Sequence, residues 1–149
     1  MILQPFVPGT AASVAFLIGP AGLYPLPPCL QHVAPETDFR YDGGEVPIPP
    51  ALAARAVALG LRAIGCMPGL CGYVGVDLVL GPDPAGNSDA AIEINPRLTT
   101  SYVGLRALAD GNVARALLAV CDGEKPAPVR WKPGRVRFRP DGTWTSGRD

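Results

Sequence analysis

The sequence predicts a single α+β domain, a mixed or mainly antiparallel sheet of about five or six short strands with helices on one face. Three observations lead to this class. Runs of β-branched and aliphatic residues are short and are separated by turn residues, with 18 glycines and 18 prolines among 149 residues. Hydrophobic residues make up 48% of the chain and charged residues 17%, a composition that excludes disorder. One longer segment, residues 51–64, is rich in Ala and Leu and predicts a helix.

The charge balance and the cysteines limit the possible partners and the location. Thirteen basic and thirteen acidic residues give a formal net charge of zero, which argues against binding to nucleic acid or to a membrane surface. The N-terminus has no basic segment before a long apolar core, and no apolar run approaches the ~20 residues of a membrane span. We therefore expect a cytoplasmic protein whose four cysteines are thiols.

The N-terminal segment predicts a strand hairpin. Residues 1–7 and 12–18 are extended in character and meet at Pro8-Gly9, a strong turn signal. Two further short strands are predicted at residues 23–26 and 29–33, which lie between prolines.

The middle of the chain predicts a loop followed by a surface helix. Residues 36–45 are polar and end in Gly43-Gly44, which predicts a turn or loop. Pro49-Pro50 can open a helix over residues 51–64. A spacing of 100° per residue places a buried face opposite two arginines; the face is Ala53, Val57, Gly60 and Ile64, and the arginines are Arg55 and Arg62.

A second hairpin follows and contains an unexpected acid. Residues 73–80 form an aliphatic run of strand length with one carboxylate, Asp77, in its middle. Residues 82–89 are a dense turn cluster, and residues 91–95 resume the apolar alternation of a return strand. Pairing across this turn brings Asp77 opposite, or nearly opposite, the polar face of the return strand.

That polar face consists of Glu93 and Asn95, with Ile92 and Ile94 predicted on the other face. Two carboxylates and an amide at one point suit a hard cation such as Mg²⁺ or Mn²⁺ better than zinc. Arg97 follows directly and can hold a phosphate or a carboxylate with its two-pronged guanidinium. The alternative is an ordinary hairpin whose outward face happens to be polar.

The C-terminal third predicts two helices and a turn-rich tail. Hydroxyls of residues 99–101 can cap a helix over 102–109, and a second helix is predicted at 113–120. Short strands are predicted at 129–131 and 136–139, and residues 143–149 are expected to be a frayed end. The alternating arginines of the tail either hold a phosphate or acidic partner or protect a solvated edge strand; they are Arg135, Arg137 and Arg139.

Residues 75–80 together with 92–97 (IEINPR) resemble the metal-binding end of the ATP-grasp superfamily of carboxylate–amine and carboxylate–thiol ligases. The resemblance implies the C-terminal lobe of the ATP-grasp fold, with ATP and Mg²⁺ (or Mn²⁺) as cofactors. By this resemblance Asp77, Glu93 and Asn95 hold the ion on the ATP phosphates, and Arg97 is catalytic beside the acyl phosphate.

The resemblance also assigns the nucleotide-binding residues at the N-terminus. There the strand that holds the adenine matches this chain with Gln4 in place of the usual Glu, and Phe6 and Val7 supply the apolar wall. Ala11 stands where many relatives carry a ribose-binding Glu, which weakens the assignment of nucleotide contacts.

The continuation, residues 98–106 (LTTSYVGLR), resembles the branch that includes the tyramine–glutamate ligase of methanofuran synthesis. The resemblance covers about residues 1–121, a partial ATP-grasp domain, and leaves 122–149 as a C-terminal extension with short strands. It implies small-molecule carboxylate and amine substrates. The phosphate-gripping lysines of the other lobe are missing, so we expect either a fragment or a chain whose N-terminal lobe comes from a separate polypeptide. A non-catalytic nucleotide- or metal-binding module, or a partner subunit, is the alternative.

Overall fold

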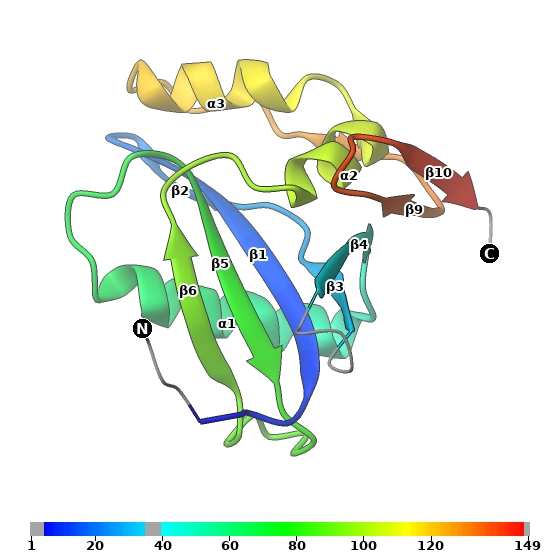
Figure 1. Ribbon diagram of the computed structural model, residues 1–149. Helices are drawn as coiled ribbons and strands as arrows, with labels where there is room; N and C mark the ends of the chain where they lie inside the picture. Colours follow the sequence, from blue (N-terminus) through cyan, green and yellow to red (C-terminus); the bar gives the residue numbers. More distant parts are fainter. Residues whose placement is uncertain (1–4, 35–39, 148–149) are drawn as a thin grey trace.

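The computed structural model describes residues 5–34 and 40–147 (Figure 1). The strands are β1 (Thr10–Gly19), β2 (Gly22–Pro25), β3 (Cys29–Ala34), β4 (Arg40–Val46), β5 (Gly72–Leu80), β6 (Ala90–Asn95), β7 (Ala109–Asp110), β8 (Arg130–Trp131), β9 (Arg135–Phe138) and β10 (Trp144–Gly147). The helices are α1 (Pro50–Gly65), α2 (Ser101–Leu108) and α3 (Val113–Cys121). Over the described ranges, no helix is long and apolar enough to cross a membrane.

One eight-stranded sheet organises the domain, in the order β10-β9-β4-β3-β1-β5-β6, with β2 paired to β1. All of its pairings among the described residues are antiparallel, and β7 and β8 form a separate antiparallel pair. The predicted α+β class with a mainly antiparallel sheet is confirmed, although the sheet has more strands than expected. The β1–β5 pair at its centre runs from Thr10 opposite Leu80 to Ile18 opposite Gly72.

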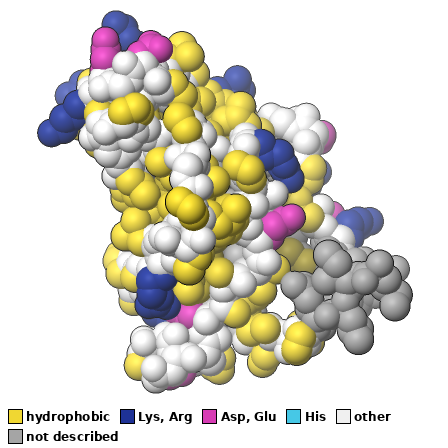
Figure 2. Space-filling model, turned by 90° about the vertical axis from the view of Figure 1, so that its left-hand side faces the viewer, with side chains coloured by type: hydrophobic (Ala, Val, Ile, Leu, Met, Phe, Trp, Pro, Cys, Tyr) yellow, Lys and Arg dark blue, Asp and Glu magenta, His cyan; other side chains and the backbone are white. Residues whose placement is uncertain are grey.

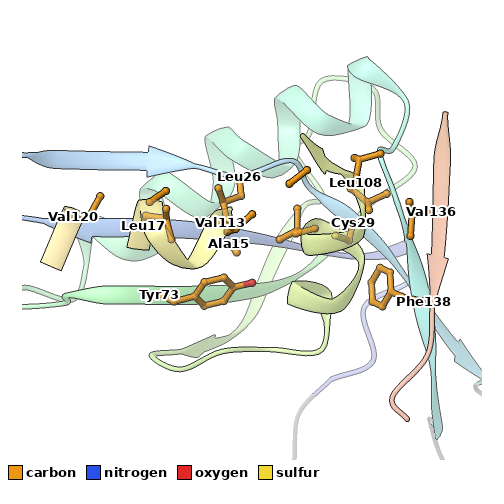
Figure 3. Close-up of a cluster of buried hydrophobic side chains, with 14 residues drawn as sticks. Ala15, Leu17, Leu26, Cys29, Tyr73, Leu108, Val113, Val120, Val136 and Phe138 are labelled. Atoms are coloured by element: carbon orange, nitrogen blue, oxygen red, sulfur yellow. The ribbon is translucent and has the colours of Figure 1, made fainter. Parts of the chain in front are cut away.

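The helices cover both faces of the sheet, where the sequence analysis expected one. On the first face, Val14 and Phe16 of β1 and Val76 of β5 are buried under α1. On the second face, Leu17 and Tyr73 pack against α2 and α3 (Figure 3). Because neighbouring residues of a strand point to opposite sides, a central strand that is apolar throughout needs a cover on each side.

Three predicted segments differ in the structure. Residues 5–9 form no strand, and β1 makes its hairpin with β2; residues 1–4 lie outside the described chain. Gly43 and Gly44 lie within β4, where the neighbouring strands approach too closely for a side chain: a Cβ on Gly43 would lie 2.0 Å from the Phe138 carbonyl oxygen. Residues 144–147, expected to be frayed, form β10 on β9.

The helix predicted at 51–64 is confirmed, but its faces are rotated relative to the prediction. The residues buried against the sheet are Ala56, Leu59, Gly60 and Ile64. Arg55, expected on the solvated face, is only 17% exposed in its side chain. Its guanidinium donates to both carboxylate oxygens of Asp89 and, at 2.8 Å, to the carbonyl oxygen of Gly81. Arg55 therefore connects α1 to the turn between β5 and β6.

Replacing Arg55 by Ala is expected to destabilise the domain by about 3 kcal/mol, because it leaves the Asp89 carboxylate, 3% exposed, without its cation. The Arg55 hydrogen bonds are the main cause that lowers the pKa of Asp89. A carboxylate with a lowered pKa stabilises the fold above about pH 4 and loses that contribution as the pH falls further. Denaturant unfolding at neutral pH and below pH 4 measures both effects. An exposed arginine of the same helix, Arg62, is the control, and an equal loss in Arg62→Ala would contradict this role.

The alternating arginines of β9 are not on an edge strand, because β9 lies between β4 and β10. Arg135 and Arg137 donate to the two carboxylate oxygens of Glu45 at 3.0 and 3.1 Å. Glu45 is buried, with 5% exposure, and His32 lies 3.9 Å from it. Arg135 and Arg137 thus join β9 to β4. Their alternation places both guanidinium groups on the side of β9 that faces the Glu45 carboxylate.

Candidate functional site

The β5–β6 hairpin brings the two predicted acids together. The strands pair with Asp77 directly opposite Glu93 and Gly75 opposite Asn95. A β-bulge follows, since the register shifts between Asp77 and Leu78. The bulge leaves Ile92 without a partner on β5, and Ile92 is 44% exposed, although it was predicted to pack on the face opposite Glu93 and Asn95. Figure 2 shows the side of the molecule on which β6 lies, and hydrophobic side chains gather over the middle of this surface.

Asn95 connects the two carboxylates. Its amide nitrogen donates to Asp77 Oδ2 at 3.0 Å and to Glu93 Oε2 at 3.1 Å. Asn95 is 6% exposed, whereas Glu93 is exposed and Asp77 is half-buried. The three side chains that the sequence analysis predicted as metal ligands therefore converge on one point of the sheet face.

Gln31 of β3 holds Asp77 from the opposite side. Its amide nitrogen donates to Asp77 Oδ1 at 2.8 Å, so each oxygen of this carboxylate accepts one amide hydrogen bond. The pKa of Asp77 is nevertheless raised, first by its partial burial and then by the nearby charge of Glu93, against the lowering effect of Gln31 and Arg97. A bound cation would relieve this excess of negative charge.

Arg97 contacts the oxygen end of the Asn95 amide. Its guanidinium donates to Asn95 Oδ1 at 3.0 Å and to the Leu98 carbonyl oxygen at 3.3 Å. The hydrogen bond from Arg97 fixes which way the Asn95 amide is turned. In this arrangement Asn95 presents nitrogen to the carboxylates, so it becomes an oxygen ligand only if its amide turns over.

The segment after β6 crosses back over β5 because Gly75 has no side chain. A Cβ at Gly75 would lie 2.6 Å from the Thr99 methyl carbon. Thr99 and Ser101 share a hydrogen bond of 2.8 Å, and the Tyr73 hydroxyl lies 3.3 and 3.2 Å from their oxygens. Burial raises the pKa of Tyr73 to about 12, so the phenol stays neutral. These hydroxyls form a network on the sheet and do not cap α2, which has no side-chain cap hydrogen bond, contrary to the prediction.

Asp77, Asn95 and Arg97 line a cleft of about 260 Å³, and Glu93 lies outside its lining. Its walls come from β1, β3, β4, β5 and the segment from β6 into α2; the lining residues are Ser13, Gln31, Val33, Tyr41, Asp77, Asn95, Arg97, Thr99, Thr100 and Ser101. This cleft lies on the second face of the sheet, where β5 continues past the cover of α2 and α3. It combines one carboxylate, one guanidinium and several neutral hydrogen-bonding groups, which suits a phosphorylated or carboxylate ligand together with a cation.

Of the predicted nucleotide-binding residues, Phe6 and Val7 are described by the structure, and neither is part of the cleft. Gln4 falls outside the described residues. Phe6 is 69% exposed and Val7 is half-buried, and neither lines the cleft. Both precede Gly9, which packs against the Leu80 end of β5. Their role in holding an adenine stays a prediction.

The donor set fits a magnesium-like ion that shares its coordination with another ligand. Over residues 5–34 and 40–147, no group of three or more His, Cys, Asp or Glu side chains is placed to hold a metal. Asp77 and Glu93 supply two carboxylates, so the remaining positions would go to water, phosphate oxygens and the turned amide of Asn95. An ion of this kind usually keeps several waters and binds through one or two carboxylates plus substrate phosphates.

Gln31 and Tyr41 line the cleft but were not among the sequence-predicted site residues. Gln31 reaches Asp77 across 46 positions of sequence, and nothing local marks it as a partner. Tyr41 of β4 lines the cleft, and burial is the main cause that raises the pKa of its phenol.

Known proteins similar to this chain match the part that holds the cleft. The family described as an ATP-grasp domain matches residues 1–101. Tyramine–L-glutamate ligases of Methanocaldococcus fervens and Methanocaldococcus jannaschii are 35% identical over 105 residues and 36% identical over 106 residues. The matches cover 70% of this chain but only 33% and 32% of those proteins, so the chain spans about a third of their length.

Solved structures give the same result for the fold. An ATP-grasp superfamily protein from Archaeoglobus fulgidus superposes with a TM-score of 0.69 at 31% identity, over 91% of this chain and 40% of the other. An L-amino acid ligase from Bacillus licheniformis has a TM-score of 0.70 at 14% identity, over 89% of this chain and 35% of the other, a likeness of fold alone. The hairpin that pairs Asp77 with Glu93 lies within the matched residues, and the chain belongs to the ATP-grasp family.

Proposed function

We propose that this chain supplies the metal- and phosphate-binding lobe of an ATP- and Mg²⁺-dependent ligase that joins a carboxylate to an amine. The observation that carries this proposal is the convergence of Asp77, Asn95 and Glu93 beside Arg97, at a cleft on the uncovered part of the sheet. Family membership supports the use of ATP.

Each residue of the site has a role in this proposal. Asp77 and Glu93, with the amide oxygen of Asn95 after it turns over, would hold Mg²⁺ or Mn²⁺. When bound, the ion supplies neutralisation of the phosphate charge. Arg97 already lines the cleft, and once the Asn95 amide turns over, its guanidinium would hold the transferred phosphoryl group or the acyl phosphate made from the carboxylate. Gln31 keeps the Asp77 carboxylate aimed at the ion.

The substrates proposed are a small carboxylate and a small amine. The relatives that match at about a third of their length are named for tyramine and L-glutamate, which makes these two compounds the first pair to test. The cleft residues that suit a carboxylate are Arg97 and the hydroxyl groups of Thr99 and Thr100.

A second lobe is part of the proposal. The chain has two lysines, Lys125 and Lys132, and neither lines the cleft, which leaves its phosphate-binding side with Arg97 as the lining cation. We propose that lysines from another segment or a separate polypeptide close over the nucleotide and exclude water.

A chimera tests this function. The matched third of the Methanocaldococcus jannaschii ligase is replaced by this chain, and ADP release is measured with glutamate and tyramine. We expect release that needs both substrates and Mg²⁺, and that falls at least about a hundredfold in the chimera carrying Arg97→Ala. A folded chimera that binds ATP with Mg²⁺ but releases no ADP would instead favour a non-catalytic binding module.

The isolated chain is expected to form no amide above background, because a half-enclosed γ-phosphate remains accessible to water. The measurement is amide product by mass spectrometry after incubation with ATP, Mg²⁺, glutamate and tyramine. The matched control is the active chimera at the same concentration. Amide formation by the isolated chain at the rate of the chimera would show that no second lobe is needed.

A further inference from the structure

Two of the four cysteines meet at the end of the sheet where β5 begins, away from the cleft. Cys71 directly precedes β5, and Cys121 is the last residue of α3. A Cβ built on Gly72, the neighbour of Cys71, lies 4.0 Å from the Cys121 sulfur. Gly72 has φ of +85°, so the backbone bends sharply between Cys71 and the strand. Figure 1 shows α3 across this end of the sheet.

The two thiols are close enough to interact electrostatically, and both residues are exposed. The pKa of Cys121 is raised by desolvation first, and then by the charge and the hydrogen bond of Cys71. The other two cysteines have different neighbours. Cys29 is buried with its thiol directed at the Pro27 carbonyl oxygen, and the Cys66 thiol donates to the Arg62 carbonyl oxygen at 3.4 Å.

The hydrophobic core fixes both α3 and β5, the elements that carry this pair of cysteines. Val120, the neighbour of Cys121, is fully buried in the cluster that also contains Tyr73 of β5. On the other side, the Val120 carbonyl oxygen lies against Gly19 of β1, where a Cβ would come within 2.1 Å. The end of α3 is therefore held against the strands, which keeps the two sulfurs as neighbours.

We propose that Cys71 and Cys121 are a redox-sensitive dithiol that oxidises reversibly to an intramolecular disulfide joining α3 to the start of β5. With hydrogen peroxide as oxidant, the two thiols supply two electrons and two protons. The S–S bond forms, the O–O bond breaks, and two water molecules leave. A small dithiol reductant reverses the reaction by thiol–disulfide exchange. The cross-link closes a loop of about fifty residues and so restricts the unfolded chain.

The test is a count of thiols after mild oxidation. The purified chain is treated with hydrogen peroxide, unfolded and alkylated, and its intact mass is measured. We expect the number of alkylated cysteines to fall from four to two and to return to four after reduction with dithiothreitol. The oxidised chain should also unfold at a higher temperature than the reduced chain, because the disulfide connects distant parts of the sequence.

Single variants identify the pair. Cys66→Ser, which removes the other exposed thiol, should still form the disulfide, and its digest should contain one peptide pair linked through residues 71 and 121. Cys71→Ser and Cys121→Ser should form no intramolecular disulfide. Four alkylated cysteines in oxidised wild type, a disulfide that includes Cys66, or disulfide-linked dimers in place of the internal bond would each overturn the proposal. Peptide mapping of Cys66→Ser keeps the test decisive even if a variant at 71 or 121 folds poorly.

Discussion

Replacing Glu93 by Gln is expected to weaken binding of Mn²⁺ with ATP by at least about tenfold, which corresponds to about 1.4 kcal/mol. Glu93 is exposed and accepts its hydrogen bond from Asn95, so its charge is available to an ion. Asp77→Asn is expected to have a smaller effect on affinity. Both oxygens of the Asp77 carboxylate already accept a hydrogen bond, from Gln31 and from Asn95, so they are less available to an ion than those of Glu93. Calorimetric titration of ATP in excess Mn²⁺ measures both changes.

The matched control for this prediction is Glu124→Gln, which removes an exposed carboxylate that lies outside the cleft. This control is expected to keep the wild-type affinity, because surface charges at a distance are screened by salt. Equal affinities in wild type, Glu93→Gln and Asp77→Asn would remove the metal assignment from this hairpin.

Replacing Phe138 by Ala is expected to destabilise the domain by about 3–5 kcal/mol. Phe138 is 2% exposed and fills the space between β9, β4 and α2. Gly104 of α2 lies so close that a Cβ there would be 2.3 Å from its ring, and a Cβ on Gly44 would be 2.8 Å from it. Truncation leaves a cavity beneath the helix that begins directly after Thr99 and Thr100 of the cleft wall.

Urea unfolding followed by circular dichroism measures this loss of stability. Trp144→Ala is the control, since Trp144 lies on the neighbouring strand β10 and is 47% exposed. We expect its effect to stay below about 1 kcal/mol. A loss for Phe138→Ala no larger than that of Trp144→Ala would mean that β9 is not part of the core.

The local sequence pattern was enough to predict the β5–β6 hairpin. Asp77 interrupts an aliphatic run, the turn residues between 82 and 89 define the hairpin, and strand alternation places Glu93 and Asn95 on one face. The observed pairing of Asp77 with Glu93 follows from these signals. These signals did not predict the β-bulge at Ile92. A single extra residue leaves the apolar–polar alternation within each flanking segment almost unchanged, so the sequence pattern does not reveal it.

Contacts between distant segments were outside the reach of pattern reasoning. Helical periodicity placed Arg55 toward solvent, although Asp89 lies within its reach across 34 positions. The alternation at Arg135 and Arg137 suggested a charged edge, whereas the buried partner is Glu45 on another strand. Gln31 could be recognised only once β3 had been placed near β5. In each case the deciding interaction joins polar groups that are far apart in sequence, and no local periodicity encodes such a pair.

Nuclear magnetic resonance with Mn²⁺ and ATP tests the proposed site most directly. The paramagnetic ion broadens the amide signals of nearby residues, so it reports where the ion is bound. We predict that substoichiometric Mn²⁺ with ATP broadens the signals of Asp77, Glu93 and Asn95, while those of Trp144 stay sharp, and that Glu93→Gln removes most of the effect. Broadening centred elsewhere, or the same broadening in Glu93→Gln, would contradict a metal and phosphate site on the β5–β6 hairpin.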